Sequence, residues 1–494
     1  MNPCLLKDFY KSGHLKMYPE GTSLVYSNLT ARKARDQNIK YIVFFGLQYF
    51  VKEYLIKQFN DEFFNLTREE AVNSYKRIMD YTLGPGVVDT AHIGKLHDLG
   101  YLPIKIKALP EGTKCPIGVP CLTIVNTRPE FYWLTNMLET ILSCIIWGMC
   151  TSATTSHEYR KIFDRYADET VGNRNHVQWQ AHDFSMRGLF GLEAACMSGA
   201  AHLLSFTGSD SIPAGLFLEK YYGANIEKEL VLASVPASEH SVSSLGSMVD
   251  GTSIRDAEFE VFRRLLQDVY PNGILSLVSD TYDFWGVITD FLPKLKSIIM
   301  NRDGKCVIRP DSSPKTPVEI MCGDPESTIE HEKKGLIECL WDTFGGTINS
   351  LGYKELDPHI GAIYGEAITL ERAETICRKL KDKGFASNNF LVGVGSMSFQ
   401  LCTRDTLGFA VKATYGEVNG GPREIFKDPK TDTGLKRSLK GMLMVYKENN
   451  IIKVKDRCSP DEEHNGLLRI VFEDGRLKNE TSLSEIREIL KSNV

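Results

Sequence analysis

A short apolar run that stops abruptly in charged and polar residues most constrains how this chain can fold. Residues 306–308 favour a buried strand of a parallel sheet, because such strands carry apolar side chains on both faces. Pro310 has no N–H for a ladder bond, so the strand ends beside Arg309 and Asp311. Ligands of α/β proteins bind at the carboxyl ends of parallel strands. We therefore expect both charged side chains to face a ligand.

The same pattern recurs along the chain from about residue 180. Each apolar run ends in polar residues and precedes a helical pattern, which is typical of an α/β barrel. An open doubly wound sheet is the alternative, because strand order cannot be read from a sequence. One helix, over 369–383, carries its apolar side chains on one face and stops at Gly384. The predicted strands and their polar ends are 203–206 with Asp210, 231–236 with Glu239 and His240, 274–278 with Asp280, 359–364 with Gly365 and Glu366, and 390–395 with Ser396.

The two ends of the chain differ from this middle part. The first 150 residues mix helices with short strands, among them a half-exposed strand over 104–109 and an apolar helix over 132–149. Beyond residue 405 the chain becomes basic and rich in turns, and it closes with a strand and a helix. With 494 residues, two domains are expected, and the C-terminal part returns to the first.

Composition excludes several classes of partner. The net charge of -5 argues against a protein that binds nucleic acid or a membrane surface, so we expect a small-molecule substrate. The most apolar window, 141–150, is far shorter than the roughly 20 residues that a bilayer requires. The first residues show a charge pair before any apolar region, and the 12 cysteines form no paired metal-binding spacing. These features predict a cytoplasmic protein with reduced thiols.

The polar strand ends combine one cation with several carboxylates. A guanidinium at Arg309 suits phosphate oxygens, and the carboxylates can accept ribose hydroxyls or hold Mg²⁺. Any one of these residues alone is more often a helix cap or a surface ion pair. Their recurrence at successive strand ends favours a sugar-phosphate site formed with Asp210, Asp280, Asp311 and Glu366.

Two further motifs have both a functional and a structural interpretation. His240 at a strand end can act as base, nucleophile or ligand, with Asp280 orienting its ring, although a lone histidine is more often structural. The run 393–396 lacks the third glycine of a dinucleotide fingerprint, so it is either a phosphate-binding loop or a tight turn. The basic residues over 423–440 are either a phosphate-facing flap or a solvated loop, and composition favours the loop.

Taken together, these motifs resemble those of the nicotinamide phosphoribosyltransferase family, which are type II phosphoribosyltransferases, over nearly the whole chain. The resemblance implies an irregular (β/α) barrel over 166–404 and an α+β domain formed by 1–165 and 405–494. It also implies a homodimer whose active sites are shared between protomers. The segments that carry the resemblance are 8–11, 45–49, 132–136, 182–188, 208–210, 234–241, 278–283, 308–312, 403–405 and 426–429.

The reaction implied by the resemblance joins nicotinamide to phosphoribosyl pyrophosphate, with Mg²⁺ as cofactor and ATP as co-substrate. Its products are nicotinamide mononucleotide and pyrophosphate. The resemblance makes His240 the residue that ATP phosphorylates, supported by Glu239 and Asp280. Nicotinate phosphoribosyltransferase is the nearest rival, and a non-catalytic binding or signalling protein on the same scaffold is a third possibility.

The same resemblance gives each site residue a role. Phe184 stacks on one face of the pyridine ring while Tyr10 of the partner subunit covers the other. Asp210 accepts from the amide NH₂ and repels a carboxylate. Glu366 stands where the family usually has aspartate. The remaining implied contacts are Arg187 and Arg309 with phosphate, Asp311, Glu366 and Gly365 with the ribose, Gly395 and Ser396 with the 5′-phosphate, Arg404 and Lys412 from the partner, and Asp8, Ser234 and Ser276 as further substrate-binding residues.

Overall fold

The computed structural model describes residues 1–311, 316–427 and 439–492. It comprises two compact units, each made of more than one chain segment. Unit 1 contains Met1–Thr154, Phe217–Ala224 and Cys402–Val494, and unit 2 contains Thr155–Leu216 and Asn225–Leu401. Most of the basic run predicted as flap or loop, together with Ser312 of the strand-end motif, lies outside the described residues.

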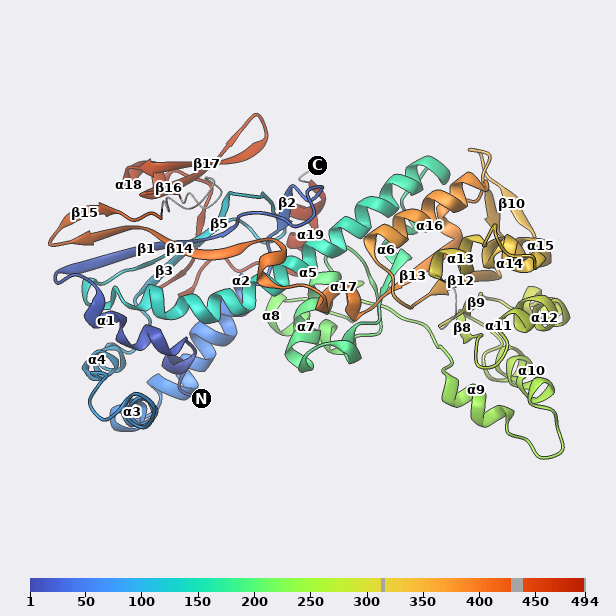
Figure 1. Ribbon diagram of the computed structural model, residues 1–494, viewed down its shortest axis with the longest axis horizontal. Coiled ribbons are helices and arrows are strands. Elements are labelled where there is room, and N and C mark those ends of the chain that lie inside the picture. The colour runs from blue at the N-terminus through green and yellow to red at the C-terminus, as the bar shows by residue number, and fades with distance from the viewer. Residues whose placement is uncertain (312–315, 428–438, 493–494) are drawn as a thin grey trace. The chain divides into compact units, whose positions relative to one another are not determined.

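Unit 1 is built on a seven-stranded sheet that includes strands from both chain ends. Its long central strands, β1 (Thr22–Ala31) and β14 (Phe409–Val418), pair antiparallel and lie side by side in Figure 1. The C-terminal part of the chain therefore completes a sheet that the N-terminal part begins. The order continues from β15 (Gly421–Glu424) through β14, β1, β5 (Pro120–Asn126), β3 (Ile104–Ala108) and β18 (Arg469–Glu473) to β19 (Arg476–Leu477).

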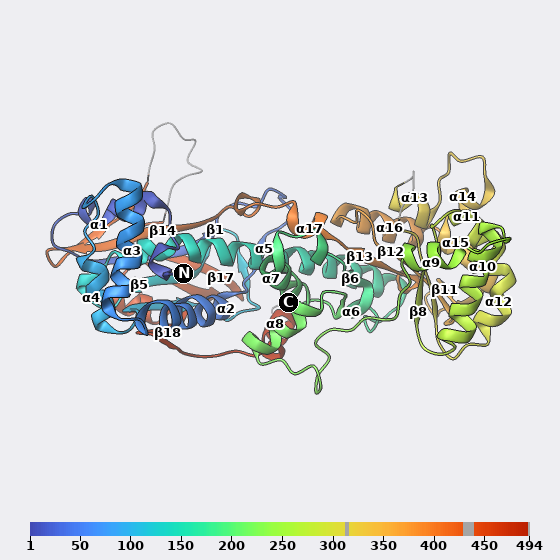
Figure 2. The ribbon, with the colours of Figure 1, turned by 90° about the horizontal axis from the view of Figure 1, so that it is seen from below.

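Short helices and hairpins accompany this sheet. The amphipathic helix α3 (Arg68–Leu83) begins with a capping box in which Thr67 and Glu70 satisfy each other's backbone N–H groups. Figure 2 shows α3 and α4 (Ala91–Leu99) next to one another. The other elements of unit 1 are α1 (His14–Met17), α2 (Leu47–Phe50), α3 (Arg68–Leu83), α4 (Ala91–Leu99), α18 (Pro460–His464), α19 (Leu483–Ser492), β2 (Tyr41–Val43), β4 (Lys114–Pro116), β16 (Met442–Glu448) and β17 (Ile451–Cys458).

Strand β3 corrects one sequence prediction. Its alternating pattern predicted one exposed face, but Lys107 on that face is buried. The ammonium of Lys107 lies 2.7 Å from the Glu463 carboxylate of α18, and both side chains are largely covered. A lysine can be buried when a carboxylate pairs with it. The partner comes from a segment more than 350 residues away, so alternation alone could not reveal the burial.

Unit 2 contains the predicted α/β barrel. Six parallel strands follow the order β7–β6–β13–β12–β9–β8. Residues 233–238 complete the ring, because Ala233 bridges Gly208 on β7 and Ala237 bridges Ser276 on β8. Pro236 cannot donate a ladder bond, which explains why this closing segment is irregular. The strands are β6 (Ala181–Asp183), β7 (Gly208–Ser209), β8 (Leu275–Val278), β9 (Cys306–Arg309), β12 (Ile360–Tyr364) and β13 (Phe390–Val394).

The helices of unit 2 pack their apolar faces against this barrel. In α16 the predicted face is buried, including Ile376 and Leu380, and the side chain of Thr369 caps the first turn. Further helices are α6 (Val177–Gln180), α7 (Gly191–His202), α9 (His240–Ser247), α10 (Ile254–Arg264), α11 (Phe284–Gly286), α12 (Leu292–Met300), α13 (Pro317–Cys322), α14 (Glu330–Lys334), α15 (Leu336–Phe344), α16 (Leu370–Asp382) and α17 (Ser396–Gln400), with the hairpin β10 (Gly346–Ile348) and β11 (Lys354–Leu356).

The strand predicted over 203–206 is absent from the described residues at that place. Helix α7 runs to His202, a turn follows, and the short strand β7 begins only at Gly208. Phe206 and Leu203 are buried in a turn rather than in a sheet. Short apolar runs are ambiguous in this way, because burial alone does not separate a strand from a packed turn.

Two helices, α5 (Leu134–Thr170) and α8 (Ile212–Tyr222), contribute residues to both units. By length and composition α5 could cross a bilayer, but 61% of its most apolar window is buried inside the protein. A buried core helix passes the same test, so its length alone says little about a membrane.

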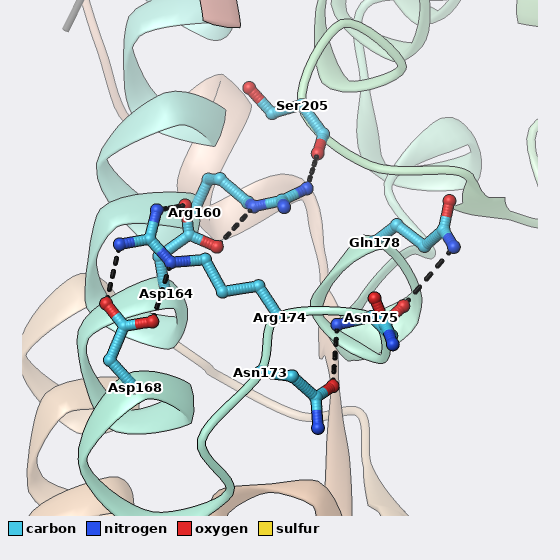
Figure 3. Close-up of polar contacts among 8 residues, drawn as sticks. All are labelled: Arg160, Asp164, Asp168, Asn173, Arg174, Asn175, Gln178 and Ser205. Carbon is cyan, nitrogen blue, oxygen red and sulfur yellow. Dashed lines mark hydrogen bonds and ion pairs between the residues drawn. The ribbon is translucent and has the colours of Figure 1, made fainter.

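A network of arginines and carboxylates fixes the end of α5 and the loop that leads into the barrel (Figure 3). Arg174 in the loop pairs with Asp168 at 2.5 Å and approaches Asp164 at 3.4 Å, and Asp164 also binds Arg160. The second nitrogen of Arg160 donates to the Ser205 carbonyl at 3.0 Å. These contacts hold the loop from which α6 and then β6 begin.

Candidate active site

The end of β6 brings an aromatic ring and a histidine to the same face of the barrel. His182 and Phe184 are two residues apart, and their ring centroids are 4.9 Å apart. Two glycines leave room for the ring of Phe184. A Cβ on Gly393 would lie 2.3 Å from Phe184 Cδ2, and a Cβ on Gly365 would lie 3.4 Å from it. The position of the Phe184 ring therefore depends on the absence of side chains on β13 and after β12.

Asp210, just beyond β7, is held by two side chains. His182 Nε2 lies 2.9 Å from Asp210 Oδ1, and the Ser234 hydroxyl donates to the same oxygen at 2.5 Å. Burial alone would raise the pKa of Asp210, but the bonds from His182 and Ser234 outweigh it and hold the pKa below its usual value. No described residue donates to Oδ2. An ionised oxygen is thus available to accept a hydrogen bond from a ligand.

A cavity of about 460 Å³ opens beside these residues. Its volume suits a small-molecule ligand. Phe184 and Asp210 also line a second hollow of about 420 Å³, together with Arg187. The first cavity brings together five of the predicted binding residues, namely Phe184, Asp210, Ser234, Ser276 and Arg309.

Arg309, at the end of β9, has one nitrogen committed and another free. Its Nη2 donates to the Ser238 carbonyl at 2.5 Å, which fixes the plane of the guanidinium. Its buried Nε has no hydrogen-bond partner among the described residues, and the same holds for the buried hydroxyl of Ser276. Buried polar atoms are normally paired, so unpaired atoms on a cavity wall indicate a ligand that satisfies them.

His240 begins α9 and is linked to the neighbouring strand ends. Its Nε2 lies 3.1 Å from Asp280 Oδ1, and the other oxygen of Asp280 accepts the Asp311 backbone N–H at 3.0 Å. The Asp280 side chain is 4% exposed, whereas that of His240 is 44% exposed. Glu239 accepts from the hydroxyl of Ser241, and no bond from Glu239 to His240 is present in the structure. Asp280 therefore orients the ring, and the open side of His240 can meet a reactant.

The carboxylates after β9 and β12 gather around Tyr364. Burial, and then the charges of Glu366, Asp280 and Asp311, raise the pKa of the Tyr364 phenol to about 12. The Asp311 carboxylate would lie 3.6 Å from a Cβ on Gly365. These residues form an acidic group beside His240, at the same barrel end as Arg309.

The glycine-containing loop after β13 contacts the turn 186–188 that follows Phe184. The backbone there starts the short helix α17 at Ser396, with Gly395 at its N-cap. A Cβ on Gly188 would lie 2.3 Å from the Ser396 hydroxyl oxygen, so this hydroxyl packs against the end of the 186–188 turn. Arg187 in the same turn is exposed. The loop is thus in direct contact with the turn that follows Phe184.

The remaining predicted site residues lie in unit 1. Arg404 and Lys412 are exposed, with Lys412 on β14. Tyr10 is 64% exposed, and Asp8 binds the Thr140 hydroxyl at 2.7 Å. The roles of these four residues stay predictions.

Two residues of the site were missing from the sequence prediction. His182 holds Asp210, and Ser238 holds Arg309 while its hydroxyl accepts the Val278 N–H at 2.9 Å. The spacing of two between His182 and Phe184 on a strand could have revealed the first. The contact of Ser238 depends on the closing segment of the barrel, which no local pattern predicts.

Comparison with known proteins shows the family of this chain. Residues 179–476 match the nicotinate phosphoribosyltransferase (NAPRTase) family, and residues 2–106 match the nicotinamide phosphoribosyltransferase N-terminal domain. The chain belongs to the nicotinate phosphoribosyltransferase family. It is therefore a pentosyltransferase, which excludes the non-enzymatic fold relatives that an α/β barrel alone would allow.

Curated members of this family resemble the chain over nearly its full length. A nicotinamide phosphoribosyltransferase of Acinetobacter baylyi is 47% identical over 99% of this chain and 97% of its own. One from Mycoplasma pneumoniae is 34% identical over 90% of this chain and 96% of its own. The predicted resemblance to that family is confirmed.

Two solved structures share the fold of this chain. Human nicotinic acid phosphoribosyltransferase aligns with a TM-score of 0.58 at 15% identity, covering 99% of this chain and 93% of its own. A nicotinate-nucleotide pyrophosphorylase from Pyrococcus furiosus aligns with a TM-score of 0.55 at 15% identity, covering 98% and 93%. The predicted irregular barrel with an α+β part is confirmed, and the open doubly wound sheet is excluded.

Proposed function

We propose that this enzyme makes nicotinamide mononucleotide and pyrophosphate from nicotinamide and phosphoribosyl pyrophosphate. The observation that carries the proposal is Asp210, an ionised carboxylate with a free oxygen on the wall of the cavity beside Phe184. A carboxylate accepts from the NH₂ of an amide and repels the carboxylate of nicotinate. The curated relatives at 47% and 34% identity, both nicotinamide phosphoribosyltransferases, support the same choice.

In this mechanism the protein mainly aligns two substrates. The pyridine nitrogen attacks the anomeric carbon of the sugar, the carbon–oxygen bond to pyrophosphate breaks, and pyrophosphate leaves with the electron pair. Phe184 stacks on the ring and Asp210 fixes its rotation, which sets the direction of the nitrogen lone pair. Arg309 and Arg187 supply positive charge for phosphate oxygens, and Asp311 and Glu366 accept ribose hydroxyls.

Mg²⁺ fits this site as a companion of the phosphates. Among the described residues no group of three or more histidine, cysteine or acidic side chains is arranged to hold a metal ion. Mg²⁺ commonly uses one or two carboxylates plus substrate phosphates, and Asp280, which contacts His240, and Asp311, whose backbone N–H bonds to Asp280, could serve. When bound, the ion would neutralise charge on the leaving pyrophosphate.

ATP enters the proposal through His240. Because Nε2 of His240 faces the Asp280 carboxylate, the proton lies on Nε2 and the lone pair on Nδ1. This nitrogen attacks the γ-phosphorus of ATP, the bond to the bridging oxygen breaks, and ADP leaves. The phosphohistidine adds negative charge at the strand ends, improves the alignment of the bound sugar, and is finally hydrolysed to phosphate.

The ATP proposal is tested with His240→Ala. This variant should lose stimulation by ATP while slow ATP-independent synthesis persists. A matched control is His359→Ala, because His359 is paired with Asp357 at 2.7 Å elsewhere in unit 2. Full ATP stimulation in His240→Ala, measured as product formed with and without ATP, would contradict the proposal.

Substrate choice is tested with nicotinamide and nicotinate in direct competition. The unmodified enzyme should prefer nicotinamide, and Asp210→Asn should shift the ratio of kcat/KM values toward nicotinate by about 100-fold. Asp382→Asn, which alters an exposed carboxylate paired with Arg378 on α16, is the control. Preference of the unmodified enzyme for nicotinate would favour the rival function. Absence of product from either substrate with Mg²⁺ and ATP would contradict the proposed reaction.

We further propose a cytoplasmic homodimer with shared sites. Large apolar side chains beside the ring site, such as Phe190 at 86% exposure, would be covered by a partner, as would Tyr10 in unit 1. The cysteines in the described part of the chain are all free thiols, as suits a reducing compartment.

A further inference from the structure

The segment that carries Asp8 and Tyr10 is bound along one face of helix α5. Lys11 donates to the Glu139 carboxylate at 2.8 Å and to the Asn136 carbonyl at 2.9 Å. The Thr140 hydroxyl donates to the Asp8 carboxylate at 2.7 Å. Residues 136, 139 and 140 are spaced by three and four, so they share one face of the helix. The segment 8–14 is therefore held to α5 at both ends.

Asn136 also controls the residue that supports the ring of Tyr10. Its Nδ2 lies 2.8 Å from His14 Nδ1, and the rings of Tyr10 and His14 pack edge to face at 5.1 Å. An amide can donate to Nδ1 only when that nitrogen is unprotonated. Burial, followed by the charge of Lys11, keeps the pKa of His14 below its usual value. A neutral His14 is thus held by α5, and its ring packs against the ring of Tyr10.

The residues before this segment are fixed to a different helix. Asn2 donates to the Ala71 carbonyl at 2.9 Å, and Lys7 donates to the Tyr75 hydroxyl at 2.8 Å. Both partners lie on α3. The chain is consequently anchored to α3 before the segment and to α5 within it. Tyr10 itself projects with 64% of its surface exposed. An outward ring on an immobilised backbone is suited to contact something outside its own unit.

We propose that the Asn136, Glu139 and Thr140 face of α5 is a positioning platform that fixes the direction of Tyr10 for stacking on the substrate ring. The proposal rests on the proposed function and on the role that the family resemblance implies for Tyr10, which is to cover the nicotinamide ring bound by the partner subunit. These three residues are positioning residues, because they act through Tyr10 rather than by touching the substrate.

The ion pair between Lys11 and Glu139 is the strongest part of this platform. The Lys11 side chain is only 2% exposed, so its charge has lost most of its contact with water. Removing the partner of a buried charge destabilises its local arrangement far more than removing an exposed pair. The segment would then leave α5 so that the ammonium regains water, and Tyr10 would lose its fixed direction.

The first experiment measures the platform directly. Glu139→Gln in the full-length enzyme should increase amide hydrogen exchange over residues 8–14. The control is Glu473→Gln, which breaks a half-buried ion pair with Lys105 in the same unit, the Glu473 side chain being 30% exposed against 34% for Glu139. Exchange over 8–14 should be unchanged in this control. Unchanged exchange in Glu139→Gln would overturn the proposal.

The second experiment measures the consequence for the substrate. Glu139→Gln should raise the KM for nicotinamide about tenfold, because a stacking ring displaced by an ångström loses most of its contact, while the KM for phosphoribosyl pyrophosphate changes little. In a Tyr10→Ala background Glu139→Gln should change the KM by less than about twofold, since residues that act through one another are not additive. Glu139→Asp should partly restore the KM.

Fully additive effects of Glu139→Gln and Tyr10→Ala would show that Glu139 acts independently of Tyr10, which would overturn the proposal. The two proposals fail separately. If the unmodified enzyme makes no nicotinamide mononucleotide, the proposed function fails. Hydrogen exchange over residues 8–14 still tests whether Glu139 fixes this segment.

Discussion

At the scale of single residues, the site depends on side chains that are absent as much as on those present. Phe184 occupies space that a methyl group on Gly393 would take, and this glycine also approaches Gly365. The φ angle of Gly393 lies outside the left-handed region, so the requirement is steric rather than conformational. Adding a methyl group at position 393 would thus displace the ring of Phe184.

We predict that Gly393→Ala raises the KM for nicotinamide by about tenfold or more and lowers stability by roughly 1–3 kcal/mol, because the new methyl overpacks the site and displaces Phe184. Steady-state kinetics and chemical denaturation measure the two effects. Gly361→Ala on β12 is the control, since its Cβ would meet only the flexible chain of Lys305 at 3.3 Å. Unaltered kinetics in Gly393→Ala would mean that the ring can move freely.

At the scale of elements, a buried carboxylate organises the start of α2. Glu111 accepts from the Gly46 N–H at 2.7 Å and from the Gln48 N–H at 2.6 Å, so it satisfies donors at the helix N-terminus. The Tyr222 hydroxyl donates to it at 3.0 Å. Despite these donors, burial raises the pKa of Glu111 to about 7.

This shift predicts a dependence of stability on pH. The pKa of Glu111 in the fold lies above its ordinary value of 4.5, so the folded state binds the proton more tightly. The stabilisation of the fold by protonated Glu111 is fully present below about pH 4.5 and is lost as the pH rises through about 7. The free energy of unfolding changes by on the order of 3 kcal/mol over this range. Glu111→Gln should remove this part of the pH dependence of the unfolding free energy. Unfolding free energies are measured by urea denaturation at several pH values. The same pH dependence in Glu111→Gln and in the unmodified protein would refute the assignment.

At the scale of the whole molecule, the proposed site is divided between two copies of the chain. Phe184 and Asp210 lie in unit 2, while Tyr10, Arg404 and Lys412 lie in unit 1. If the partner's unit 1 completes each site, a defect in either set of residues should inactivate a homodimer. A mixed dimer would then keep one intact site.

We therefore predict complementation between Arg404→Ala in unit 1 and Asp210→Ala in unit 2. Each variant alone should be nearly inactive with nicotinamide. After joint refolding or co-expression, the mixture should recover about a quarter of the activity, because half of the dimers are mixed and each has one intact site. Activity per site and mass in solution check this together. A monomer, or a mixture no more active than its components, would contradict shared sites.

Sequence patterns predicted the barrel well where a strand is apolar throughout and ends in a charged group. The strand ending at Arg309 and the helix over 369–383 are examples, and both are present. The patterns were wrong at two places. Lys107 is buried by its pairing with Glu463, which is more than 350 residues away in the sequence. The run 203–206 packs as a turn after the helix that ends at His202, because burial alone does not separate a strand from a packed turn.

The sequence by itself determined the class of fold and the family, and it proposed the side chains of the site, because strand periodicity and strand-end chemistry are local properties of the chain. Only the tertiary structure decided how those side chains are held. Three contacts join residues that are separate in sequence. They are the hydrogen bond between His182 and Asp210, the hydrogen bond from Arg309 to the Ser238 carbonyl, and the ion pair that attaches the Tyr10 segment to α5. Direction and protonation of a functional group are set by such neighbours, which become neighbours only when the chain has folded.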